Sequence, residues 1–172
     1  NLFALVKFYK AAEAAGLKPV AGADLWLSAD GAPPSRLTLL CQEREDSLTL
    51  SRLISRAFLE GHAGDYVAIE PDWLYQDCRG LVAIAGRDSL LGQALAAGRE
   101  DQAARVLRDL RAAFPDRLYL ELTRTGRDGE EAFNHAAIAL GAQHGLPLLA
   151  SNDVRFLARE DFDAHEARVC IA

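Results

Sequence analysis

GLVAIAG at residues 80–86 is a short, continuous apolar run between two glycines. Five apolar residues in a row are too few for a typical helix, and such a run is typical of a strand that is covered on both faces. The residues that follow it, 90–114, are rich in Ala, Leu and Arg and have helical spacing. The sequence therefore predicts a strand at residues 81–85 that leads into a helical segment.

The same alternation extends in both directions from this strand. Further strands are expected at residues 18–27, 37–41, 117–122 and 146–150. Helices are expected at residues 2–15, 47–60 with Asp46 as N-cap, 90–114 with a break near Gly98, 130–144 with Gly145 as its stop, and from about residue 160. Residues 62–75 have no regular pattern.

Short apolar strands that alternate with helical segments predict an α/β fold. Such strands usually pair in parallel through right-handed crossovers, so we expect an α/β barrel or an open doubly wound sheet. No repeat, low-complexity tract or linker divides the chain, so residues 1–172 are interpreted as a single domain.

Composition excludes several classes of protein. Half of the 172 residues are hydrophobic and 26% are charged, which is typical of a globular domain, and the net charge is −6. No apolar run is long enough to span a membrane, and the net acidity argues against a nucleic-acid-binding module. The three cysteines are far apart and indicate neither a disulfide framework nor a zinc site, which favours the reducing cytoplasm.

In parallel α/β folds the reactive groups follow the carboxyl ends of the strands. The residues in such places are Asp24, Cys41, Arg87, those at 123–126, and those at 151–155. A metal-dependent phosphoesterase needs imidazoles and carboxylates there, because these ligands bind catalytic Zn or Mn. Carboxylates are present, but the four histidines, at positions 62, 135, 144 and 165, fall elsewhere and are interpreted as structural. Phosphate-binding glycine loops and the GxSxG motif are absent.

The loop Ser151-Asn152-Asp153 allows two interpretations. Asn and Asp after a buried strand can bind their own backbone and fix a loop. Equally, Asp153 could be a residue inherited from a metal site. Nearby Arg155 favours an ion pair over a bound cation, because a guanidinium repels divalent metals.

This loop also carries a family resemblance. Residues 146–156 (LPLLASNDVRF) and 160–166 (EDFDAHE) closely resemble the PHP (polymerase and histidinol phosphatase) domain of bacterial DNA polymerase III alpha subunits, in its proteobacterial form. Further matches in the same order are NLFALVKFY (1–9), GLKPVAGAD (16–24), LISRA (53–57), FPDR (114–117) and LELTRTG (120–126).

The resemblance implies a distorted (β/α)7-type barrel of which the N-terminal strand and helix portion, with the family's first histidine pair, lies upstream of Asn1. It also implies a metal site that has degenerated. Arg155 and Thr125 stand where histidines are expected, and Arg36 and Arg87 occupy two further ligand positions, so that Asp24 and Asp153 are what remains. We therefore expect a vestigial site with no catalytic residue and no metal; the alternative is weak Zn or Mn binding.

The function implied is structural. The domain would hold the proofreading exonuclease subunit near the polymerase and contact the remainder of the alpha subunit, and it would meet DNA only within the full polymerase. The parent would be a DNA-directed DNA polymerase, whereas this piece alone would not be catalytic. The alternatives are an active metal-dependent PHP phosphoesterase with 3′-5′ proofreading activity, and an unrelated small-molecule enzyme on an α/β barrel.

Overall fold

The structure is a computed structural model that describes residues 2, 4–28, 34–63 and 66–171. Its helices are α1 (Leu5–Ala14), α2 (Asp46–Glu60), α3 (Pro71–Gln76), α4 (Leu90–Ala96), α5 (Glu100–Ala113), α6 (Glu130–His144) and α7 (Phe162–Ile171), with a 3-10 helix at Arg159–Asp161. Its strands are β1 (Gly22–Leu27), β2 (Ser35–Cys41), β3 (His62–Ala63), β4 (Tyr66–Ile69), β5 (Leu81–Ala85), β6 (Leu118–Thr123) and β7 (Leu148–Ser151).

The strands form one seven-stranded sheet in the order β3-β4-β1-β2-β5-β6-β7. The α/β class is confirmed, and the expected parallel pairing holds for only part of the sheet. β5, β6 and β7 are parallel and β1 is parallel to β4, whereas β2 is antiparallel to both of its neighbours and β3 is antiparallel to β4. Parallel neighbours need a long crossover, and only a short connection separates β1 from β2, so these two strands form a hairpin-like pair.

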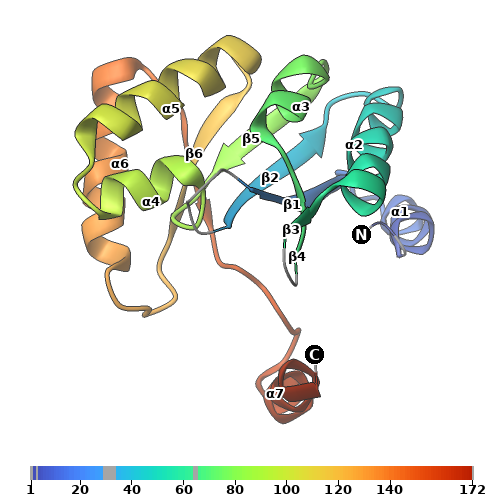
Figure 1. Cartoon of the computed structure of the whole chain (residues 1–172). Coiled ribbons are helices and arrows are strands. Elements are labelled where there is room, and N and C mark those ends of the chain that lie inside the picture. The colour runs from blue at the N-terminus through green and yellow to red at the C-terminus, as the bar shows by residue number, and fades with distance from the viewer. Residues whose placement is uncertain (1, 3, 29–33, 64–65, 172) are drawn as a thin grey trace.

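One face of the sheet carries the hydrophobic core. Alternate residues of β1 point into it (Ala23, Leu25 and Leu27), and they pack with the buried faces of α2, α4, α5 and α6. Figure 1 shows α2–α6 on one side of the sheet and α7 on the other side, apart from it. The edge strands β3 and β7 are not paired with each other in the described residues, so the sheet is open there.

Several local predictions need correction. The break near Gly98 is confirmed, with a positive φ of 62° between α4 and α5. Asp46 is not an N-cap: it is the first residue of α2, and its carboxylate accepts a hydrogen bond from Glu43 N at 2.7 Å. The irregular stretch after residue 62 contains β3, β4 and α3.

One tryptophan and one cysteine lie outside the core. Trp26 is 39% exposed and packs against Tyr66, with ring centroids 5.6 Å apart, on the face of the sheet that α2–α6 leave open. Cys78 is buried, which raises the pKa of its thiol, but Cys170 on α7 is exposed. No described helix is long and apolar enough to cross a membrane.

Candidate functional site

The polar site lies where the carboxyl ends of β5, β6 and β7 meet the amino end of β2. Because β2 runs antiparallel to β5, its second residue, Arg36, lies beside the turn that follows β5, and Arg36 N donates to Asp88 O at 2.8 Å. A small pocket at this place is lined by Arg36, Arg87, Asp88, Glu121, Thr123, Thr125, Arg127, Glu130 and Asp153. Residues from four separate segments of the chain, at 36, 87–88, 121–130 and 153, therefore converge on one end of the sheet.

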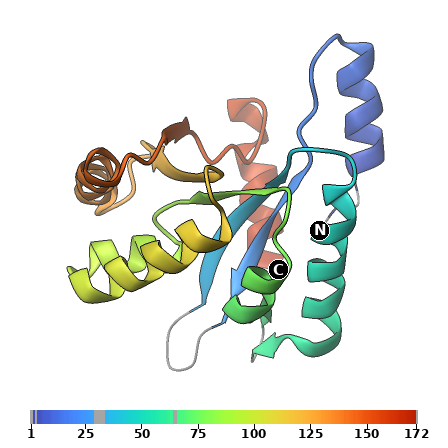
Figure 2. The same cartoon turned by 90° about the horizontal axis from the view of Figure 1, so that it is seen from above.

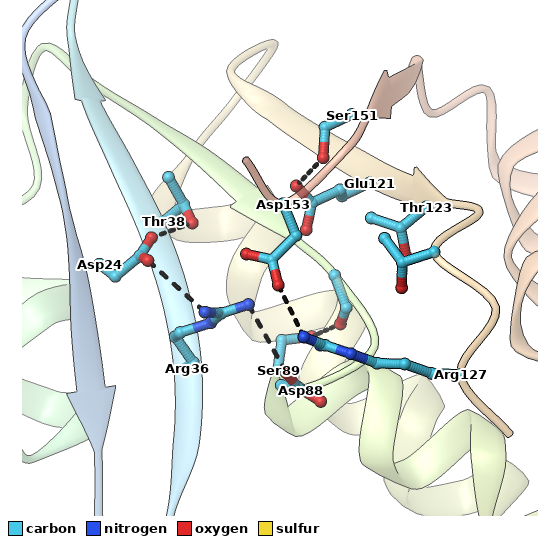
Figure 3. A network of polar contacts seen from close by, with 12 residues as sticks. Asp24, Arg36, Thr38, Asp88, Ser89, Glu121, Thr123, Arg127, Ser151 and Asp153 are labelled. Atoms are coloured by element: carbon cyan, nitrogen blue, oxygen red, sulfur yellow. Dashed lines mark hydrogen bonds and ion pairs between the residues drawn. The ribbon is translucent and has the colours of Figure 1, made fainter. Parts of the chain in front are cut away.

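Arg36 joins two carboxylates. Its guanidinium lies 3.7 Å from Asp24 and 3.5 Å from Asp88, and its side chain is only 21% exposed. Thr38, which faces Asp24 across the β1–β2 ladder, donates its hydroxyl to the Asp24 carboxylate at 2.5 Å. Figure 3 shows Arg36 between the two acids. Each carboxylate oxygen of Asp24 thus already has a partner, a hydroxyl for Oδ1 and a guanidinium for Oδ2.

Asp153 forms ion pairs with two further arginines. Arg127 Nη2 lies 3.0 Å from its Oδ2 and Arg155 Nη2 lies 2.7 Å from its Oδ1, while the Asp153 side chain is 17% exposed. The backbone of Asp153 has a φ of 45°, a left-handed conformation that Asp adopts more readily than most residues. This part-buried carboxylate therefore ties the segment after β7 to the loop after β6.

Glu130 organises that loop. It is the first residue of α6, it is 4% exposed, and its carboxylate accepts hydrogen bonds from the Thr123 and Thr125 hydroxyls at 2.7 and 2.9 Å. The backbone N–H groups of Thr125 and Gly126 donate to it as well, at 2.7 and 2.9 Å. The hydrogen bond from Thr123 and then those from Thr125 and Gly126 lower the pKa of Glu130 to about 2, against desolvation, which raises it.

Two charged side chains complete the pocket. Arg87 is half-buried and forms no ion pair with another described residue. Glu121 accepts a hydrogen bond from the Ser151 hydroxyl at 2.5 Å. A side-chain hydrogen bond therefore joins β6 and β7 in addition to their backbone ladder.

This arrangement does not fit a divalent metal. Among the described residues no group of three or more His, Cys, Asp and Glu side chains is placed to hold a metal ion. The carboxylates of Asp24 and Asp153 are paired with arginines, and guanidinium groups have no lone pair to donate and repel cations. The absence of metal remains a prediction.

All six positions predicted from the sequence converge here. Arg36, Arg87, Thr125 and Asp153 line the pocket, Asp24 pairs with Arg36, and Arg155 pairs with Asp153. Their descent from metal ligands remains a prediction. His135 and His144 lie on α6 and His165 on α7, outside the pocket, and the His62 side chain lies outside the described residues.

Sequence reasoning missed Asp88, Glu121, Arg127 and Glu130. The only signal for Glu121 is a lone acid within the apolar strand LYLELT, at the position that alternation places opposite the core. Glu130 resembles an ordinary acidic residue in the first turn of a helix, and nothing in the sequence shows that it turns back to the loop.

Comparison with known proteins assigns the domain. The model of the PHP domain family matches residues 1–125. The chain belongs to the PHP domain family. Over its full length it is similar to DNA polymerase III subunit alpha: 56% identical in Xylella fastidiosa (strain Temecula1), 45% in Pseudomonas aeruginosa and 41% in Escherichia coli K12.

These relatives are much longer than the chain. The matches cover 99–100% of this PHP chain but only 14–15% of each relative. The resemblance to the PHP region of DNA polymerase III alpha subunits, including proteobacterial ones, is therefore confirmed.

Proposed function

We propose that this PHP domain is a metal-free structural domain of a DNA polymerase III alpha subunit, and that it docks the proofreading exonuclease subunit during DNA replication. The observation that carries the proposal is the pair of arginine–carboxylate clusters, Asp24–Arg36–Asp88 and Arg127–Asp153–Arg155, at the end of the sheet where a metal phosphoesterase needs its ligands.

The chemistry of these clusters favours support over catalysis. A hydrolytic metal site needs neutral imidazoles and free carboxylates around an open coordination position. Here the carboxylates of Asp24, Asp88 and Asp153 already have cationic partners, and the pocket offers arginine and threonine side chains where imidazoles would be needed. Ion pairs between segments that are distant in the sequence hold the loops in place, which is a structural role.

The biological setting is also part of the proposal. The relatives bear the name DNA polymerase III subunit alpha, and the chain matches about one seventh of their length. We propose that this domain contacts the remainder of such a subunit in the cytoplasm, that it meets DNA only through the complete DNA-directed DNA polymerase, and that polymerase activity belongs to other parts of that protein.

Metal analysis tests the first half of the proposal. The full-length subunit would be incubated with Zn²⁺ or Mn²⁺, desalted and analysed for bound metal, and assayed for release of phosphate or nucleotide from a 3′-phosphoester. We expect metal content near zero and no metal-dependent release, with a metal-replete PHP phosphoesterase as the positive control. Stoichiometric metal with such release would overturn the proposal in favour of an active PHP phosphoesterase with 3′-5′ proofreading activity.

Calorimetric titration with the proofreading exonuclease subunit tests the second half. We expect saturable binding by the full-length polymerase subunit. The absence of association at roughly tens of micromolar would contradict the docking role. A Kd in that range corresponds to a binding free energy of only about 6 to 7 kcal/mol.

A further inference from the structure

The loop that follows β6 already holds an anion. The Glu130 carboxylate accepts hydrogen bonds from the hydroxyls of Thr123 and Thr125 and from the backbone N–H groups of Thr125 and Gly126, at 2.7 to 2.9 Å. Successive N–H groups that converge on one point form a concave nest, an arrangement that binds anions in proteins. Gly126 allows this conformation with its φ of 84°. We call these four donors the loop nest.

The carboxylate is held as a bound ligand would be. Each of its oxygens accepts two hydrogen bonds, Oε1 from the two hydroxyls and Oε2 from the two N–H groups. Glu130 is only 4% exposed. Among the residues that the structure describes, no arginine or lysine forms an ion pair with it. The loop nest therefore binds a negative charge by hydrogen bonds alone.

The surroundings of the loop nest are also favourable to an anion. Glu130 is the first residue of α6, so the positive end of this 15-residue helix lies beside the nest. Arg87 lines the same pocket, and a Cβ placed at Gly129 would lie 3.8 Å from its Nη2. Arg87 forms no ion pair with a described acid, so its charge is available to this side of the pocket.

The position and size of the site limit what it can hold. In Figures 1 and 2, α6 lies on the side of the molecule opposite α1. The pocket beside the loop nest has a volume of about 20 Å³, roughly the room that one water molecule needs. A planar carboxylate of the size of formate matches the place that the Glu130 carboxylate fills, whereas a tetrahedral phosphate is larger than this space.

We propose that the loop nest is an oxyanion-binding site in its own right, with Glu130 as its resident ligand, and that a small free carboxylate binds there when the Glu130 side chain is removed. The donors belong to the loop, so removing the side chain leaves all four without their acceptor. A water molecule can accept from two of them, whereas a carboxylate accepts from all four through charge-assisted hydrogen bonds. This inference does not rest on the proposed docking function.

Chemical rescue tests the proposal in the full-length subunit. Hydrogen exchange measured by mass spectrometry would follow the peptide that carries the Thr125 and Gly126 amides. In sodium chloride, Glu130→Ala should exchange these amides faster than the unmodified subunit does. In sodium formate of equal ionic strength the exchange should slow with saturation, by about tenfold at ten times the half-saturating concentration.

Two variants serve as matched controls. Glu130→Gln fills the same place with an uncharged amide, so formate should leave its exchange unchanged. Glu131→Ala removes the exposed neighbour in the same helical turn and should exchange as the unmodified subunit does.

Each further outcome decides for or against the site. Equal exchange of Glu130→Ala in formate and chloride would overturn the proposal, as would an equal effect of formate on the unmodified subunit. Sodium phosphate that slows exchange as well as formate does would show that the carboxylate assignment is wrong. If Glu130→Ala also loses the protection of β5 and α4 in chloride, its return in formate supports the site and its continued loss overturns it.

Discussion

Glu130 gives this domain a defined response to acid. Its carboxylate has a pKa of about 2 in the folded chain, against an ordinary value of 4.5, because two hydroxyls and two backbone N–H groups donate to it. A lowered folded pKa means that the unfolded chain binds the proton more tightly. The stability that Glu130 contributes is therefore complete above pH 4.5 and is lost as the pH falls from 4.5 to about 2.

The substitution Glu130→Gln tests this response. Glutamine keeps the shape but loses the charge, so the variant should be less stable than the unmodified chain at neutral pH and should lose less stability on acidification to about pH 2. Urea unfolding followed by circular dichroism across that range measures both effects. Glu131→Gln, which changes the exposed neighbour in the same helical turn, is the control and should keep the pH dependence of the unmodified chain.

Asp153 is the second residue with a measurable role. Removing it leaves two half-exposed arginines without their acid, so Asp153→Ala should lower the free energy of unfolding by about 1 kcal/mol. Arg127→Ala should cost less, because Arg155 still pairs with Asp153. A double-mutant cycle on Asp153 and Arg127 measures their coupling, and a coupling of zero would show that this ion pair contributes nothing.

At the scale of the element, a glycine allows the start of α4 to lie close to the turn before it. Gly92 lies in the first turn of α4, and a Cβ there would come within 2.3 Å of the Gly86 carbonyl oxygen and 2.4 Å of that of Arg87. Ser89 caps the same turn by accepting the Gly92 N–H at 3.0 Å. The helix therefore begins in close contact with the turn that carries Arg87 and Asp88 into the pocket.

The substitution Gly92→Ala should destabilise the domain by about 2 kcal/mol or more, because a methyl group against backbone atoms forces the helix away from the turn. Thermal unfolding measures the loss. Gly98→Ala is the matched control: a Cβ there meets no described atom within 4 Å, so only the positive φ of 62° opposes it, at about 1 kcal/mol. Equal losses in the two variants would contradict the close contact.

The elements show what the sequence could and could not predict. Each predicted strand and helix is present within a few residues, because apolar periodicity and glycine stops are local signals. The direction of β2 is not a local property. It depends on the short connection from β1 to β2, and its reversal is what brings Arg36 beside Asp88.

The candidate site, too, could be predicted only where the signal is local in the sequence. The resemblance to the PHP family identified Asp24, Arg36 and Asp153, because those residues occupy family positions in motifs that can be read along the chain. The partners of these residues come from other segments. Arg127, for example, lies in a loop whose sequence gives no sign that it reaches Asp153. Which side chains pair across the fold is therefore not a local property of the sequence.

At the scale of the whole molecule, stability should be unevenly distributed. The core between the sheet and α2–α6 holds fully buried side chains such as Leu39, Leu81 and Phe114. By contrast, α7 has no buried residue; it follows an extended segment, and Leu157 before it is 98% exposed. In Figure 1, α7 lies apart from the sheet, on the side opposite α2–α6.

A helix of 10 residues with no buried residue, whose aromatic contacts are with Phe156 of the segment before it, is marginal in water, because isolated helices of this length do not repay the cost of nucleation. Hydrogen exchange on the 172-residue chain should therefore show α7 amides exchanging close to the rate of an unfolded peptide, while those of β5 and α4 stay protected until the domain opens as a whole. Protection of α7 equal to that of α4 would show that its exposed residues Phe162, Val169 and Ile171 are covered in solution.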